Sequence, residues 1–220
     1  MEVIQLRLGG VTLPAQHPRA GADYPLFGYL LLHDDGPILV DTGAGPGHPG
    51  IDLNFELEPV DLPAALGAAG VGILDITMVI NTHLHFDHIG GNRHFPGVPI
   101  VAQGDEIEAA KASGFTVGEW VEFPGAVLRP VAGTVELAPG VIVMPTPSHT
   151  PGHQSVVVRS GERIEVIAGQ ALHDRTELTS GVSAEGLPPA MESFASVAAR
   201  IKALRPNRVW FSHDAEPWLP

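Results

Sequence analysis

Short apolar runs separated by glycine, proline and polar residues dominate the chain. In the first half, these runs predict strands over residues 3–8, 27–33, 38–41, 76–80 and 99–102. In the second half, they predict strands over residues 127–131, 134–137, 141–144, 155–159, 164–167 and 209–211. The pattern therefore predicts two successive groups of short strands.

Three segments have the spacing and end signals of helices. Asp61 is a candidate N-cap for a helix that ends at Gly70, and further helices are expected over residues 105–113 and 189–204. Because helices come late in each half, we expect an α/β (α+β) fold. Its form would be a four-layer αβ/βα sandwich, in which two mixed sheets pack face to face with helices outside.

Length and composition are those of one soluble globular domain over residues 1–220. Hydrophobic residues make up 44% of the chain and charged residues 17%, and no linker or repeat divides it. No apolar run reaches the roughly 18 residues that a membrane-spanning helix needs. The N-terminus lacks the basic and apolar segments of a signal peptide. We therefore expect a cytoplasmic protein that does not bind membranes.

The charge balance weighs against nucleic acid as a partner. The net charge is −13, and the 12 Lys and Arg residues form no basic cluster, so phosphates would be repelled. The chain contains no cysteine, and any metal ion must therefore be held by nitrogen and oxygen ligands. The expected partner is a small-molecule substrate.

Four metal-binding side chains follow the predicted strand at residues 76–80. They are His83, His85, Asp87 and His88. Imidazole nitrogens and carboxylate oxygens are ligands that zinc and similar divalent ions prefer. A histidine-rich polar loop without a metal is the alternative interpretation. Four such residues within so short a segment favour a metal site.

Other polar residues also follow predicted strands. Asp41 ends an early strand. His149 and His153 lie in a second histidine loop, and His213 follows the last strand. Because strand ends can converge on one rim of a sandwich, we expect these patches to meet the first one.

The loop at residues 82–92 and the order of the other patches resemble the metallo-β-lactamase-fold hydrolases. Within them the chain most resembles the N-acyl-homoserine lactonase group, also in residues 99–101 and 106–110. The similarity extends from about Gly28 to Asp214. The resemblance implies the metallo-β-lactamase sandwich and a hydrolase of the quorum-quenching kind.

The resemblance further implies two divalent metal ions. Zinc is expected, and Mn²⁺, Fe²⁺ or Co²⁺ would suit the same donors. The implied ligands are His83, His85 and His149 for one ion and Asp87, His88 and His213 for the other.

Several residues near these motifs are expected to have other roles. His153 is interpreted as structural. Asp41 either orients a ligand histidine or only forms its turn. The histidines without a partner motif are expected to be solvated, and they are His17, His33, His48 and His94.

The chain departs from the family pattern at Gln170. The family has an aspartate there that bridges both metals, and a neutral amide lacks its charge and second equivalent oxygen. Three outcomes are open. Gln170 binds one ion through its carbonyl, Asp174 enters the site instead, or the second site is weak and the enzyme works with one ion.

His173 lies where the lactonase group carries a tyrosine that contacts the substrate carbonyl. A histidine there would either donate a hydrogen bond to a developing oxyanion or be a surface loop residue. His173 and Asp87 are therefore the candidate catalytic residues. Asp87 would take the proton of the nucleophile and pass it to the leaving alkoxide.

The predicted activity is opening of a lactone or cleavage of a carboxylic ester, with an N-acyl-homoserine-lactone-like substrate. A metal ion lowers the pKa of bound water to about 7, and the resulting hydroxide would attack the carbonyl. The alternatives are thioester, β-lactam or phosphodiester hydrolysis, or a metal-binding and sensing module with little turnover because of Gln170. Ser148 does not lie in a nucleophile elbow, so a serine hydrolase is not expected.

Specificity is expected to come from loops around the metals, at residues 15–26, 45–58 and 176–189. Four aromatic residues are expected to be either apolar walls of the site or part of the core, and they are Phe27, Tyr29, Phe55 and Phe86. By analogy with the family, a homodimer is the oligomeric state to test.

Overall fold

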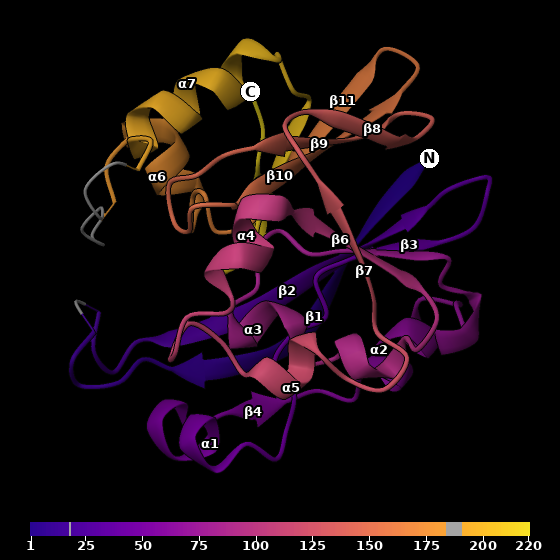
Figure 1. The fold of residues 1–220 in the computed structure, drawn as a ribbon. Coiled ribbons are helices and arrows are strands. Elements are labelled where there is room, and N and C mark those ends of the chain that lie inside the picture. The colour runs from indigo at the N-terminus through magenta and orange to yellow at the C-terminus, as the bar shows by residue number, and fades with distance from the viewer. Residues whose placement is uncertain (18, 184–190) are drawn as a thin grey trace.

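Two sheets packed face to face form the centre of the computed structural model, which describes residues 1–17, 19–183 and 191–220 (Figure 1). The first sheet has the strand order β4-β1-β2-β3-β5-β6-β7 and the second the order β13-β12-β11-β10-β9-β8. Both are mixed, since β3, β5, β6 and β7 run parallel beside an antiparallel β1–β2 pair, and β11 and β12 are parallel in the second sheet. The predicted fold class is confirmed.

Most strands follow the apolar runs of the sequence, and only β4 and β13 among those described were not predicted. Those of the first sheet are β1 (Glu2–Thr12), β2 (Asp23–Leu32), β3 (Ile38–Val40), β4 (Glu58–Pro59), β5 (Met78–Ile80), β6 (Pro99–Gln103) and β7 (Val127–Val131). Those of the second are β8 (Val135–Ala138), β9 (Val141–Pro145), β10 (Gln154–Ser160), β11 (Arg163–Ile167), β12 (Arg208–Phe211) and β13 (Asp214–Trp218).

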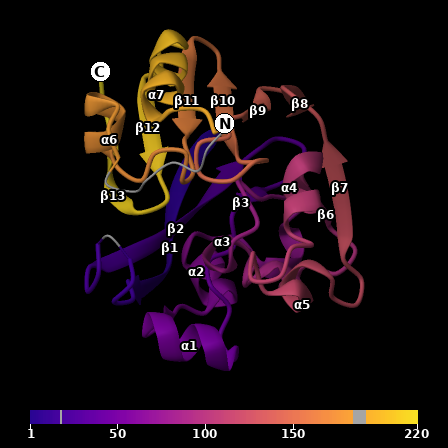
Figure 2. The same ribbon diagram turned by 60° about the vertical axis from the view of Figure 1, so that its left-hand side comes forward.

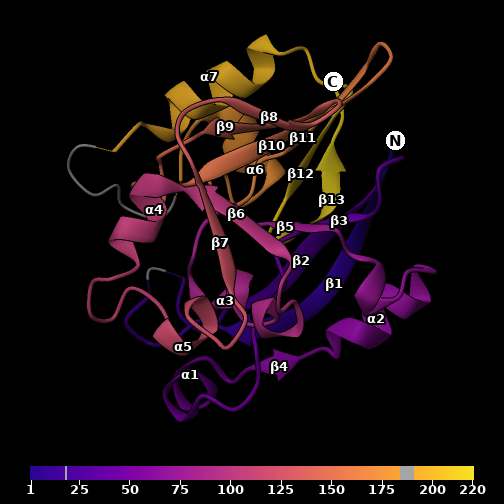
Figure 3. The ribbon, with the colours of Figure 1, turned by 45° about the vertical axis from the view of Figure 1, so that its right-hand side comes forward.

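Short helices cover the outer faces of both sheets. They are α1 (Pro49–Phe55), α2 (Leu62–Ala68), α3 (Phe86–Ile89), α4 (Gly104–Ala109), α5 (Gly118–Val121), α6 (Arg175–Ser180) and α7 (Phe194–Ala203), with 3₁₀ turns η1 (Ile73–Asp75) and η2 (Asn92–His94). Helices α6 and α7 lie over the second sheet and α2 lies beside β1 on the far side of the first, as Figures 2 and 3 show. Among the described residues, no helix is both long and apolar enough to cross a membrane.

Alternating side chains along the strands build separate apolar layers. Tyr29 and Leu31 of β2 point into the core between the sheets, where they meet Val156 and Trp210 of the second sheet. Leu30, between them in sequence, belongs instead to the layer under α2. Because successive side chains of a strand point to opposite faces, one apolar strand serves both layers. Phe27 and Tyr29 are thus core residues, which decides between the two roles that the sequence left open for them.

Helix boundaries differ from the prediction where apolar periodicity is weak. The carboxylate of Asp61 accepts the amide of Ala64 at 3.1 Å, so the predicted N-cap of α2 is present. Helix α4 ends before the predicted 105–113 segment does. In α7, Ser193 caps the described helix, and the predicted start at residue 189 lies outside the described residues. Helices α1 and α6 were not predicted and lie within or overlap the loops assigned to specificity.

Candidate metal centre

Three histidines from two loops meet at one rim of the sandwich. His83 follows β5, His85 caps α3, and His149 lies in the loop between β9 and β10. One nitrogen atom of each lies within 4.8 Å of the others, and Nε2 of His149 is 3.0 Å from Nδ1 of His85. The structure thus brings together the three residues that the sequence assigned to one ion.

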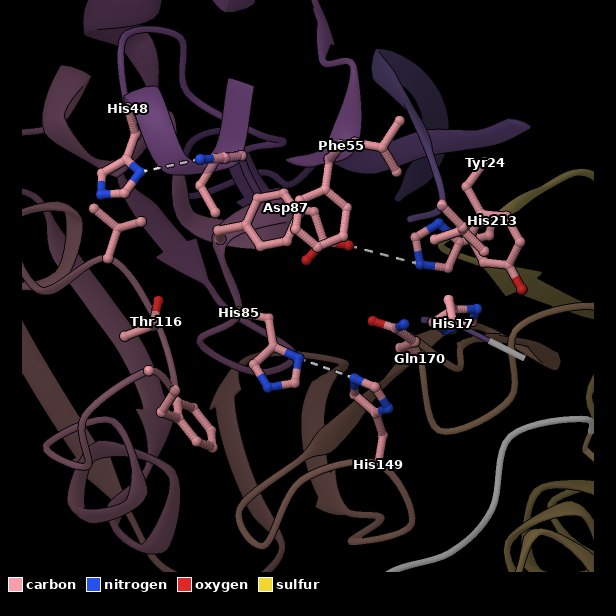
Figure 4. Close-up of a pocket in the computed structure, with 17 residues that line it drawn as sticks. His17, Tyr24, His48, Phe55, His85, Asp87, Thr116, His149, Gln170 and His213 are labelled. Atoms are coloured by element: carbon pink, nitrogen blue, oxygen red, sulfur yellow. Dashed lines mark hydrogen bonds and ion pairs between the residues drawn. The ribbon is translucent and has the colours of Figure 1, made fainter. Parts of the chain in front are cut away.

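A second group of donors shares His83. Ligand atoms of His83, Asp87 and His88 also lie within 4.8 Å of one another. Nε2 of His213 is 3.8 Å from Oδ2 of Asp87, and Figure 4 shows the two side chains facing each other. Oε1 of Gln170 lies 3.2 Å from Nε2 of His88. The residues predicted for the second ion therefore adjoin the three-histidine group.

Buried polar partners fix the orientation of these rings. Asp41 accepts the amide of Thr82 at 2.8 Å and Nδ1–H of His88 at 2.8 Å, so Nε2 of His88 faces Gln170 and Asp87. Asp41 itself has φ +58°, a left-handed conformation that is uncommon outside glycine. Its position supports the interpretation of Asp41 as an orienting residue.

His153 engages both ring nitrogens within the protein. Its Nε2 accepts the amide of Gln170 at 3.0 Å, and its Nδ1 lies 2.9 Å from the hydroxyl of Thr146. An imidazole whose two nitrogens are both occupied offers no lone pair to a metal. This geometry supports the structural role predicted for His153.

Burial keeps His83, His149 and His213 neutral. Burial lowers the pKa of His83 and His149 well below the ordinary histidine value, and neighbouring histidines lower it further. Burial likewise lowers the pKa of His213 to about 4, although Asp87 opposes this. A neutral imidazole is the form that ligates metals.

The Asp87–His88 pair is charged. Burial opposes ionisation of Asp87, but His88 and His213 hold its pKa well below its usual range. Burial also opposes the charge on His88, but Asp87 and Asp41 outweigh it and raise the pKa of His88 to about 10. A cation bound here would take the place of that proton, since only the neutral ring ligates.

The donor set fits divalent ions. Nε2 of His83 and Nε2 of His213 are buried and make no hydrogen bond to the described residues. Burying a polar atom without a partner costs free energy, which a bound cation would remove. Histidine and carboxylate donors in such a cluster suit zinc and similar ions. His83, His85, Asp87, His88, His149 and His213 would hold them.

The structure bears on two of the open alternatives. Asp174 accepts the amide of Glu177 at 2.9 Å as the N-cap of α6 and lies 3.8 Å from Arg19. It is therefore engaged outside the cluster, and its entry into the metal site stays a prediction. His173 is fully buried and bonds Glu177 through Nδ1 at 2.9 Å, so it is not a surface loop residue.

His173 packs against the cluster rather than on the cavity wall. Its ring stacks on that of His213, with centroids 6.1 Å apart, and lies 5.8 Å from the ring of His149. It is not among the residues that line the cavity beside the cluster. Its predicted hydrogen bond to an oxyanion stays a prediction.

A cavity of about 440 Å³ opens beside the metal-ligand candidates. His85, Asp87, His149, Gln170 and His213 form its polar wall. Figure 4 shows His48 and Thr116 at one end and Tyr24 and His17 at the other. The apolar wall consists of Val11, Leu13, Ile51, Phe55, Phe86, Phe115 and Val117.

The cavity lining corrects the sequence analysis. Phe55 and Phe86 line it as predicted. His17 and His48, predicted to be solvated, also line it because the loop after β1 and the start of α1 fold over the site. His94 is exposed as predicted, whereas His33 is half-buried.

Tyr24 and Ile51 line the cavity from two of the loops predicted to set specificity, although neither residue was singled out. Phe115 lies outside those loops and was not predicted to line the cavity. No local pattern marks these three residues, since an aromatic or aliphatic residue near a strand is more often part of the core.

Comparison with protein families decides the relationship. A model of the metallo-beta-lactamase superfamily matches residues 26–213. The chain belongs to this superfamily. An N-acyl homoserine lactonase from a Bacillus species is 32% identical over 212 residues, which cover 88% of this chain and 83% of that lactonase. A probable metallo-hydrolase of Mycobacterium tuberculosis is 31% identical over 183 residues, covering 68% of this chain and 57% of that protein.

Two solved lactonase structures share the fold. One is a mutant of AiiA from B. thuringiensis with N-decanoyl-L-homoserine bound at its active site, with a TM-score of 0.82 at 26% identity. The other is an N-acyl homoserine lactone hydrolase with the product N-hexanoyl-L-homoserine at its catalytic metal centre, with a TM-score of 0.82 at 27% identity. Each match covers 97% of this chain and 93% of the solved one. These similarities confirm the prediction of a metallohydrolase.

Proposed function

We propose that the protein opens the lactone ring of N-acyl-homoserine lactones or of closely similar acyl lactones. One observation carries this proposal, namely the position of the His and Asp cluster on one wall of a cavity whose other walls are apolar. Such a cavity suits a substrate with a polar reacting head and an apolar tail. The relatives with acyl-homoserine products in their active sites support the same substrate class.

The cavity walls would seat the acyl chain. Phe55 and Phe86 lie against each other, with ring centroids 4.6 Å apart, and line the cavity together with Ile51. Removing apolar surface from water stabilises a complex by roughly 0.8 kcal/mol for each buried methylene. These walls therefore favour substrates with longer acyl chains.

The polar wall would carry out the reaction. His83, His85 and His149 would hold one divalent ion, with zinc the expected metal. Asp87, His88 and His213 would hold a second ion, bound more weakly because Gln170 is neutral. Bound divalent ions supply an activated water and polarise the carbonyl. Asp87 is ionised and faces His213 across the cavity wall, so it takes the proton of the nucleophile and returns it to the leaving alkoxide.

Hydrolysis of a substrate panel by the zinc-loaded protein tests the proposal. The panel contains homoserine lactones with butanoyl to decanoyl chains, an acyl thioester, a β-lactam and a phosphodiester. We expect lactones to have the highest kcat/KM. A phosphodiester or β-lactam that reacts faster would contradict the proposal. Lactone binding without turnover would instead favour the metal-binding and sensing alternative.

A further inference from the structure

A buried carboxylate outside the ligand set joins the two histidine loops. Glu106 belongs to α4 and is fully buried. Its Oε1 accepts the amide of Leu84 at 2.9 Å. Its Oε2 accepts the hydroxyl of Thr150 at 2.7 Å and the amide of Gly152 at 3.0 Å. Three donors from two separate loops thus converge on one side chain.

These donors adjoin all members of the three-histidine group. Leu84 stands between His83 and His85 in the sequence, and Thr150 directly follows His149. Carboxylate hydrogen bonds are charge-assisted and stronger than those between neutral groups. Glu106 therefore ties the segment that carries His83 and His85 to the segment that carries His149.

The contact between the second loop and α4 is close. A Cβ at Gly152 would lie 2.1 Å from the backbone nitrogen of Glu106 and 2.5 Å from its Cα. No side chain fits there, so the loop lies directly against the start of α4. This close approach lets the carboxylate reach both loops.

Asp41 makes the corresponding contacts for the other donor group. It bonds Thr82 and His88, whereas the hydrogen bonds of Glu106 reach Leu84, Thr150 and Gly152. Of the two buried carboxylates, Asp41 is thus the one that bonds His88 directly, and Glu106 is the one that reaches the loop of His149.

We infer that Glu106 is a positioning residue for the three-histidine metal site, where it holds His85 and His149 at the separation that one ion requires. The inference rests on the metal centre of the proposed function. Partners of this kind typically change metal affinity by roughly 10–100-fold when they are removed.

Glu106→Gln is the decisive substitution because it keeps the shape of the side chain. An amide offers one acceptor oxygen and one NH₂ group. In either orientation, the NH₂ faces a backbone amide, of Leu84 or of Gly152, and that hydrogen bond is lost. One loop is then released from α4.

Glu165→Gln is the matched control. Glu165 is also buried, and it accepts the indole N–H of Trp210 at 2.7 Å and pairs with Arg163 at 2.7 Å. None of these partners belongs to a histidine loop. This substitution therefore tests the loss of a buried carboxylate without a change at the metal site.

The experiment measures zinc affinity by chelator competition, the absorption spectrum of the Co²⁺-loaded protein, and the free energy of unfolding. We expect Glu106→Gln to lower the affinity for one zinc ion by roughly 10–100-fold and to alter the Co²⁺ spectrum. Glu165→Gln should lower the free energy of unfolding and leave the zinc affinity and the Co²⁺ spectrum unchanged. If Glu106→Gln does not fold, Thr150→Val removes one of the three donors, and a smaller loss of the same ion is expected.

Zinc affinity of Glu106→Gln within about threefold of the wild type would overturn the inference, as would an equal loss in Glu165→Gln. A wild-type protein that binds no zinc would instead contradict the proposed function. The two failures are therefore distinguished by the wild-type measurement.

Discussion

Gln170 places a neutral amide among charged and metal-binding groups. Its Oε1 lies 3.2 Å from Nε2 of His88, and its side chain lines the cavity. An amide oxygen can bind a cation but brings no negative charge. Asp174, the other candidate carboxylate of this segment, caps α6. In the proposed metal centre the second ion would then have one anionic ligand, Asp87, and we expect it to be the more weakly bound of the two.

Replacement of Gln170 by aspartate should strengthen the binding of the second ion. The added charge attracts the cation directly, and we expect its affinity to rise on the order of tenfold. Gln170→Asn is the matched control, because it shortens the side chain equally and adds no charge. Metal stoichiometry and competition with a chelator measure the effect. A fall in both metal content and activity in Gln170→Asp would show that Gln170 does not occupy the bridging position.

Among the elements, helix α1 shows where sequence patterns lose their information. It has no buried residue and is seven residues long, so it lacks the apolar stripe that marks a packed helix. Most strands were predictable because their apolar runs enter the core, whereas β4 and β13 lack such runs and were not predicted. The residues of the histidine loops were predictable because the chemistry of their side chains is local. The loops that carry Tyr24 and Ile51 were predicted, but the two residues were not singled out, since their role depends on which segments meet in the fold.

Two side chains of α1 one turn apart face the cavity, while a third faces solvent. Ile51 and Phe55 line the cavity, and Leu53 is 83% exposed. We expect Phe55→Ala to lower kcat/KM for decanoyl-homoserine lactone by about 10-fold or more, and for the butanoyl lactone by much less. Leu53→Ala should change neither value. Equal losses for both chain lengths would contradict an acyl-chain role for Phe55.

The whole molecule carries a pH-dependent stability that arises from its neutral histidines. The pKa values of His83, His149, His153 and His213 are lowered, first by burial. In the unfolded chain they take up protons near pH 6.5. The folding stability that these four histidines contribute is thus fully present above about pH 6.5 and is lost as the pH falls. His88 acts in the opposite sense, because its raised pKa gives stability that is lost between about pH 6.5 and 10.

The metal-free protein should therefore become less stable between pH 7 and 5. Each histidine that only the unfolded chain protonates adds a slope on the order of 1.4 kcal/mol per pH unit. Urea unfolding of chelator-treated protein at several pH values measures the slope. Stability that stays constant or rises on acidification would argue against a buried neutral cluster.

Lactone hydrolysis by protein stripped of metal and then titrated with zinc tests the proposed function most directly. We expect the stripped protein to be folded at pH 7.5 and inactive toward N-acyl-homoserine lactones, and activity to return as zinc binds. Wild-type protein that opens lactones equally well without metal, or that binds zinc and opens none, would contradict the proposed function.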